Sequence, residues 1–137
     1  TFRKTGQRRD LNREKFEANE LIERLKNFNS SASKNISYLS HIIKVRASLV
    51  AFHPEASMKC LYTNIPNCVI IQRGSGKDRV FVICNMSKEN INFQIFNELN
   101  LLELISKKRL KDNISGSFLN SKCKLNPYQV MWLSLVD

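Results

Sequence analysis

The chain has 137 residues, of which 42% are hydrophobic and 25% are charged, and its formal net charge is +10. This length and apolar content suit one folded domain, or a small domain joined to part of another. The longest apolar runs hold about five residues, far fewer than the roughly 20 that a membrane-spanning helix needs, so an integral membrane protein is not expected.

Two amphipathic helices are predicted in the first third of the chain. Between Glu14 and Phe28 the apolar residues recur at helical spacing, and the polar stretch 27–33 then interrupts the pattern. We expect Ser33 to cap a second helix that ends near Ser48. Each helix has an apolar stripe that needs a partner, either within a small domain or in a larger protein.

From about Met58 the hydrophobic period changes to two, which predicts short strands separated by turns. Gly74–Asp78 is a hairpin signal between two of them. Helices followed by strands indicate an α+β chain with an antiparallel β-sandwich rather than a doubly wound sheet. The predicted strands are 58–62, 68–73, 79–86, 91–95, 101–105, 122–125 and 128–135. The predicted core includes Val69, Ile71, Val80, Val82, Leu125, Val130 and Trp132.

The four cysteines lie in apolar segments without CxxC spacing or a companion pair of histidines. We expect them to be reduced, buried side chains in a cytoplasmic protein; a disulfide framework is the weaker alternative. The basic excess is +6 in residues 1–50 and +4 in residues 51–137. Because it is dispersed and lacks interleaved surface aromatics, we expect a solvated basic surface and no specific nucleic-acid site.

Four segments, taken in chain order, carry a resemblance to a known family. Thr5–Arg13 is similar to a segment with the motif Arg-Asp-Ile-Asn-Arg, and Ile43–Pro54 resembles the link from a catalytic barrel to a following β-domain. Arg79–Ser87 resembles a strand that places an Asn before a small polar residue, and Leu125–Leu133 is similar to a closing strand. In this order the four segments resemble the α-amylase family (glycoside hydrolase family 13), in particular sucrose phosphorylase, glucosylglycerate phosphorylase and their relatives.

The resemblance implies that residues 1–53 are the end of a (β/α)8 catalytic barrel, namely a loop and its last helices. Residues 54–137 would be the C-terminal β-domain. The family transfers a glucosyl unit with retention: a carboxylate attacks the anomeric carbon, a carboxylic acid protonates the leaving oxygen, and an acceptor such as phosphate takes the sugar. These carboxylates lie upstream of the matching segments, so no catalytic residue, metal or cofactor is expected in this chain.

Arg9 matches the family's arginine that faces the glucose-binding subsite, which makes Arg9, Asp10 and Arg13 the candidate substrate-binding residues. A guanidinium offers forked donors that suit sugar hydroxyls or phosphate, and Asp10 could orient Arg9 or Arg13. The alternative is a salt-bridged barrel rim without ligand contact. Arg8 adds a neighbouring charge and leaves open which arginine faces the sugar.

Other candidate sites have simpler structural explanations. Glu17, Glu20 and Glu23 suit the polar side of a helix, and His53 before Pro54 suits a hinge that binds backbone. Trp132 could stack on a sugar but suits a core position better, because its strand is apolar on both faces.

The leading hypothesis for the function is therefore a fragment of a sucrose phosphorylase-like enzyme. Its parent enzyme would act on a glucoside such as sucrose or glucosylglycerate, with phosphate, and the missing barrel portion would be a partner. The alternatives are a freestanding sugar-binding β-module and a basic nucleic-acid-binding protein.

Overall fold

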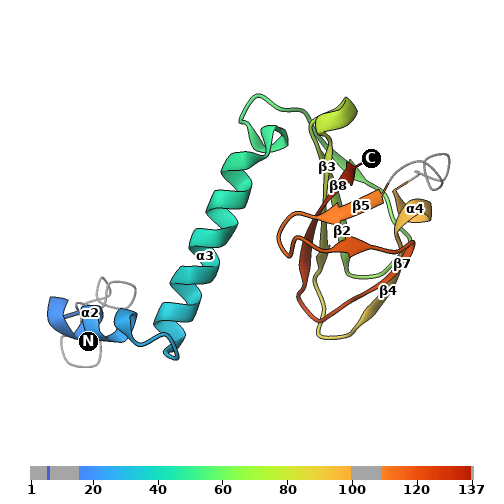
Figure 1. Cartoon of the computed structure of the whole chain (residues 1–137). Coiled ribbons are helices and arrows are strands. Elements are labelled where there is room, and N and C mark those ends of the chain that lie inside the picture. Colours follow the sequence, from blue (N-terminus) through green and yellow to red (C-terminus); the bar gives the residue numbers. More distant parts are fainter. Residues whose placement is uncertain (1–5, 7–15, 100–108, 137) are drawn as a thin grey trace. The chain divides into compact units, whose positions relative to one another are not determined.

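The computed structural model describes residues 6, 16–99 and 109–136 and divides the chain into two compact units, residues 1–41 and 42–137. The two predicted helices are present as α2, Ala18–Lys26, and α3, Ser31–Ser48 (Figure 1). None of the residues of α2 is buried, and Ser33 is the buried residue of α3. The apolar stripes that define both helices in the sequence therefore remain largely exposed.

The cap of α3 differs from the prediction. Ser30, not Ser33, precedes the first helical residue, and its hydroxyl oxygen accepts a hydrogen bond of 3.0 Å from the backbone N–H of Ser33. The same hydroxyl donates to the carbonyl of Arg24 at 2.6 Å, which joins the end of α2 to the start of α3. Several serines follow one another here, so composition alone does not show which of them caps the helix.

The rest of the described chain is mostly antiparallel β-structure. The six-stranded sheet has the order β1-β2-β3-β8-β5-β6, and β4 and β7 form a separate antiparallel pair. The short 3-10 helix η2 (Val50–Phe52) precedes the first strand, and a second one, η3 (Gly76–Asp78), and the one-turn helix α4 (Ile95–Glu98) lie between strands. The strands are β1 Met58–Leu61, β2 Cys68–Arg73, β3 Val80–Asn85, β4 Ile91–Gln94, β5 Arg109–Asp112, β6 Phe118–Leu119, β7 Lys122–Leu125 and β8 Val130–Val136.

The predicted hairpin between β2 and β3 is confirmed. The two strands pair from Cys68↔Asn85 to Arg73↔Val80, and Gly74 and Gly76 adopt positive φ angles of 67° and 57°. Glycine populates this region without the steric cost that a Cβ atom brings.

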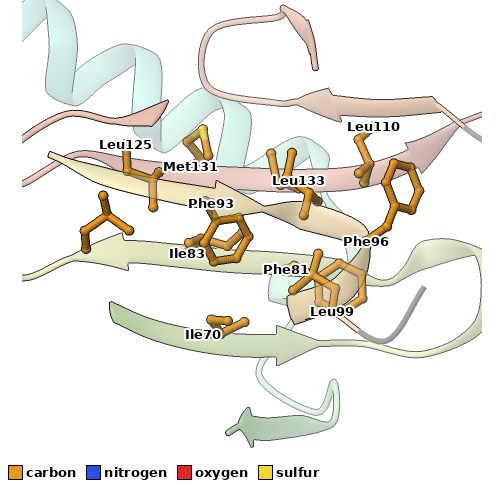
Figure 2. Packing of buried hydrophobic residues seen from close by; sticks show 12 residues of the cluster. Ile70, Phe81, Ile83, Phe93, Phe96, Leu99, Leu110, Leu125, Met131 and Leu133 are labelled. Carbon is orange, nitrogen blue, oxygen red and sulfur yellow. The ribbon is translucent and has the colours of Figure 1, made fainter. Parts of the chain in front are cut away.

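The hydrophobic core lies between one face of the six-stranded sheet and the layer formed by β4, β7 and α4 (Figure 2). Phe81 and Ile83 of β3 and Phe93 of β4 are at most 1% exposed. The other labelled members come from neighbouring elements: Ile70, Phe96, Leu99, Leu110, Leu125, Met131 and Leu133.

The predicted core is largely wrong, because it selected the opposite face of the six-stranded sheet. Val80 and Leu125 are buried, but Val69 and Val130 are 41% and 39% exposed, and Ile71, Val82 and Trp132 are only partly buried. Successive side chains of a strand point to opposite faces. An assignment that is wrong by one residue therefore exchanges the buried and the exposed side chains along the whole strand. Apolar residues occupy both faces of β2, β3 and β8, and periodicity therefore cannot choose between them.

Three elements are missing from the prediction, namely α4, β5 and β6. Strand β5 has the sequence Arg-Leu-Lys-Asp, with a single apolar residue, and β6 has only two residues. The predicted strand 101–105 lies outside the described residues. The architecture is α+β with antiparallel sheets, as predicted.

Candidate functional site

The predicted substrate-binding residues Arg9, Asp10 and Arg13 lie outside the described residues. Their contact with a sugar remains a prediction. The structure does describe three of the four segments that carry the family resemblance, and it shows what their polar and aromatic residues do.

The segment that leads into the β-domain is anchored to the six-stranded sheet. Arg73, at the end of β2, donates from Nε to the carbonyl of Ala51 at 3.2 Å and from Nη2 to the carbonyl of His53 at 2.9 Å. The rings of Phe52 and Trp132 lie 4.6 Å apart at 51°. A Cβ atom on Gly74 would come within 3.2 Å of the Cβ of Ala51, so this close approach favours glycine.

His53 and Arg46 act within the same segment. The Nδ1 atom of His53 accepts the backbone N–H of Glu55 at 3.2 Å, which confirms the predicted backbone-binding role. Arg46 donates from Nη2 to the carbonyl of Phe52 at 3.4 Å. Arg73 was not predicted as part of this arrangement; an arginine at a strand end, directly before a glycine, is the signal that could have indicated it.

The side chain of Asn85 connects two turns by hydrogen bonds. Asn85 is 1% exposed, and its Nδ2 donates to the carbonyls of Glu89 at 2.7 Å and Asn126 at 2.8 Å. Its Oδ1 accepts from the backbone N–H and the hydroxyl of Ser87, at 2.9 and 2.8 Å. The asparagine side chain thus uses both its donors and its acceptor inside the protein, which suits a structural residue rather than a ligand contact.

The buried carboxylate of Asp112 also forms its hydrogen bonds within the β-domain. Its Oδ1 accepts from the backbone N–H groups of Ile114 at 3.2 Å and Trp132 at 2.9 Å, and its Oδ2 accepts from Ser115 at 3.2 Å. A carboxylate held by several backbone donors stabilises a turn and has little capacity left for substrate.

Three further carboxylates have partners within the protein. Glu20 and Glu23 form ion pairs with Arg24 and Lys26 on the exposed side of α2, as expected for a polar helix face. Glu98 accepts the hydroxyl of Thr63 at 2.7 Å. This bond lies beside a cavity of about 560 Å³, where Tyr62 is 86% exposed.

All four cysteines are free, as predicted, but their burial differs from the prediction. Cys60 is exposed, and the other three are partly buried. Burial raises the pKa of the Cys68 thiol to about 11, with smaller contributions from Glu98 and Cys84, and burial also raises the pKa of Cys123 to about 11. A thiol with such a pKa is almost entirely protonated at neutral pH, so neither is an activated nucleophile.

Within residues 6, 16–99 and 109–136, no cluster of His, Cys, Asp and Glu could hold a metal ion. No helix in this part of the chain has both the length and the hydropathy needed to cross a membrane.

The comparisons with known proteins give one similar sequence and one similar fold. No family model matches the chain. It is 31% identical over 132 residues to the glucosylglycerate phosphorylase of Allomeiothermus silvanus, a match that covers 96% of this chain and 21% of that protein. The trehalose-6-phosphate hydrolase of Bacillus licheniformis has a similar fold, with a TM-score of 0.58 over 85% of this chain and 20% of that chain at 13% identity.

The chain spans about a fifth of the length of both relatives. The sequence match covers nearly the whole chain, and the structural match shows a shared fold. The chain is thus similar to the C-terminal part of a glycoside hydrolase family 13 enzyme, as its motifs predict.

Proposed function

We propose that the chain is the C-terminal part of a retaining glucosyl-transferring enzyme that resembles sucrose phosphorylase and glucosylglycerate phosphorylase. The observation that carries the proposal is the 31% identity to a glucosylglycerate phosphorylase along 96% of the chain. The whole enzyme would transfer glucose between a glucoside and phosphate, using carboxylates outside this chain. The role of residues 54–137 would be to support the catalytic domain.

The contacts of three polar residues of the β-domain support this non-catalytic role. Arg73, Asn85 and Asp112 direct their polar atoms to backbone groups of the β-domain and its entry segment. Residues 1–53 would contribute the last barrel helices and a loop in which Arg9 contacts the sugar. The isolated chain is then expected to release no glucose 1-phosphate from sucrose or glucosylglycerate.

The test is a chimera in which this chain replaces the matching 132 residues of the Allomeiothermus enzyme. Phosphorolysis of glucosylglycerate should be retained in the chimera. Arg9→Ala should lower its kcat/KM at least tenfold, whereas Arg8→Ala is the matched control and should change it less. A soluble chimera without activity, or an isolated chain with activity, would contradict the proposal.

The alternative of a freestanding sugar-binding module is less well supported. The aromatic residue that could have served it, Trp132, packs against Phe52 and is only partly exposed. Titration of the isolated chain with sucrose and maltose, followed by the fluorescence of Trp132, distinguishes the two: millimolar or tighter binding would favour the module.

A further inference from the structure

Strand β1 forms one edge of the six-stranded sheet. In the part of the chain that the structure describes, β2 is its single neighbour. One residue before β1, the carbonyl of Ser57 accepts the backbone N–H of Gly74 at 2.8 Å. Hydrogen-bonded positions alternate with non-bonded positions along an antiparallel pair, so Lys59 and Leu61 also bond to β2. The residues between them turn their backbone N–H and C=O groups away from β2.

These outward backbone groups belong to Met58 and Cys60, and Tyr62 continues the series just after the strand. An unpaired edge of this kind is a template for pairing with another strand. The side chains are exposed as well, by 64% for Met58 and 86% for Tyr62. The edge therefore offers a partner both backbone donors and acceptors and apolar side chains.

A second copy of the chain fits this edge in an antiparallel register centred on Cys60. In that register the two Cys60 residues face each other and exchange both of their backbone hydrogen bonds. Met58 then faces Tyr62 of the second copy, and Lys59 faces Leu61 of the second copy. Like charges directly opposite each other destabilise a strand pair, and this register opposes none. A two-fold axis repeats each contact, as in most homodimers.

Charge complementarity at the edge favours a second copy as the occupant. Leu61 and Glu98 line the cavity of about 560 Å³ beside β1. Opposed residues of a strand pair direct their side chains to the same face, so Lys59 of the second copy would lie beside Leu61 and reach toward Glu98. The Oε2 atom of Glu98 accepts the hydroxyl of Thr63 at 2.7 Å, and a carboxylate can accept further donors.

We propose that β1 pairs with β1 of a second copy of this chain, which forms a two-fold dimer with one sheet continuous across both chains. The strand has four residues, so the interface is small and the association is weak. The inference goes beyond the proposed function and does not depend on it, because the contacts involve neither a sugar nor a catalytic group.

The experiment measures the mass of the chain by light scattering and sedimentation over about a hundredfold range of concentration. Salt at about 0.15 M reduces the Debye length to about 8 Å and screens the repulsion between two basic chains. Cys60→Pro removes the outward N–H at the centre of the interface and spares the bonds of β1 to β2, since an edge strand tolerates a proline whose nitrogen faces solvent. Cys60→Ala keeps the N–H and is the matched control.

The unmodified chain and Cys60→Ala should both form dimers as the concentration rises, whereas Cys60→Pro should remain monomeric. Circular dichroism checks that the proline variant is folded. A chain that is monomeric at every concentration would overturn the inference. Dimers that persist in a folded Cys60→Pro variant would do the same, because they would form through another surface, such as the exposed stripes of α2 and α3.

Charge exchange keeps the inference testable if the proline variant does not fold. Lys59→Glu and Glu98→Lys should each lower the association constant at least tenfold, because each places like charges together across the two-fold axis. The double variant restores opposite charges and should recover the association. A double variant that associates as weakly as the single variants would contradict the register.

Disulfide trapping gives an independent measure of the same register. Facing residues at a hydrogen-bonded position have Cα atoms about 5.5 Å apart, a separation that a disulfide can span. Oxidised glutathione is the oxidant: the two Cys60 thiols form the disulfide as it is reduced to two molecules of glutathione. The control places one thiol at an exposed turn between β2 and β3, in the double variant Cys60→Ala, Ser75→Cys.

The yield of cross-linked dimer, divided by the alkylation rate of each thiol with iodoacetamide, should be at least tenfold higher for Cys60 than for the control thiol. Equal normalised yields would show that the thiols meet only by random collision, and the proposed pairing of β1 would then be wrong.

Discussion

Asn85 has a disproportionate effect on the fold for a residue that forms no part of the hydrophobic cluster. Its side chain satisfies two carbonyls and a backbone N–H in two separate turns, and it is almost completely buried. Replacing it leaves these groups without their partner in a site with little access to water. The energetic penalty of an unsatisfied buried group exceeds the net gain from one hydrogen bond.

Asn85→Ala is therefore expected to lower the free energy of unfolding of the β-domain by about 3 kcal/mol. Urea denaturation followed by the fluorescence of Trp132, the single tryptophan, measures this change. Asn92→Ala, at an exposed position of β4, is the control and should stay within about 0.5 kcal/mol of the unmodified chain. Equal denaturation midpoints for the two variants would contradict the assigned role of Asn85.

The thiols of Cys68 and Cys123 make stability depend on alkaline pH. Each has a pKa of about 11 in the folded chain against an ordinary value of 9.0, because burial disfavours the thiolate. The folded pKa is the higher one, so the contribution to stability is complete below about pH 9 and is lost as the pH rises toward 11. The melting temperature should fall between pH 8.5 and 10.5, and fall less in the double variant Cys68→Ala, Cys123→Ala. Cys60→Ala is the control, and parallel curves for all three proteins would contradict the expectation.

At the scale of the elements, the junction between α2 and α3 depends on one hydroxyl. The side chain of Ser30 caps the first turn of α3 and donates to the last turn of α2. Ser30→Ala should destabilise α3 by about 1 kcal/mol, because a backbone N–H then loses its capping partner. Circular dichroism at 222 nm during a thermal scan detects the loss. Ser33→Ala keeps the capped N–H and is the matched control; an equal loss in both variants would place the cap elsewhere.

Sequence patterns predict the helices on either side of this junction but not the residue that caps α3. Both helices and most strands are predictable, because their period of 3.6 or 2 is a direct consequence of burying one side of the element. The exact cap is not predictable, since Ser30, Ser31 and Ser33 are chemically equivalent in a sequence. Strand β5 is not predictable either, because Lys111 and Asp112 are polar and the segment is a strand only through its pairing with β6 and β8.

Sequence patterns also do not show which face of β2, β3 and β8 is buried, for a different reason. The sequence places Val69 and Ile71 beside Ile70, so that both sides of the strand are apolar and the period-2 pattern disappears. The layer of β4, β7 and α4 covers only one side, and which side depends on a tertiary contact that no local pattern records. A strand with apolar side chains on both faces predicts a packing layer on each side. The layer of β4, β7 and α4 covers one side.

The candidate site is less predictable than the fold, for a physical reason. Arg9, Asp10 and Arg13 are singled out by a resemblance, since a short charged loop has no periodicity from which its neighbours could be inferred. Asn85 and Asp112 each have partners two to four residues away, which is a local turn pattern, but their bonds to Asn126 and Trp132 span 41 and 20 residues, and no local pattern records those.

At the scale of the whole molecule, the helices α2 and α3 and the β-domain bury their apolar residues very differently. The helices expose Leu21, Ile22, Ile36, Leu39 and Ile43 by 37–58%, whereas the β-domain has a continuous cluster of buried residues. Burying such a side chain contributes roughly 1.5–3 kcal/mol, and a short helix without tertiary contacts is marginal in water. Local stability should therefore differ strongly along the chain.

Hydrogen–deuterium exchange by mass spectrometry, on a sample shown to be monomeric by light scattering, tests this difference. Amides of residues 18–48 should exchange at least about a hundredfold faster than those of β2, β3 and β8, after correction for intrinsic rates. The internal control is β4, whose pairing with β7 should protect it as part of the same core. In the chimera with the Allomeiothermus enzyme the helical amides should become slow, because the missing surface is restored. Equal protection of helices and strands in the isolated monomer would mean that the chain buries its own helices, and it would contradict the proposal that the chain is part of a larger enzyme.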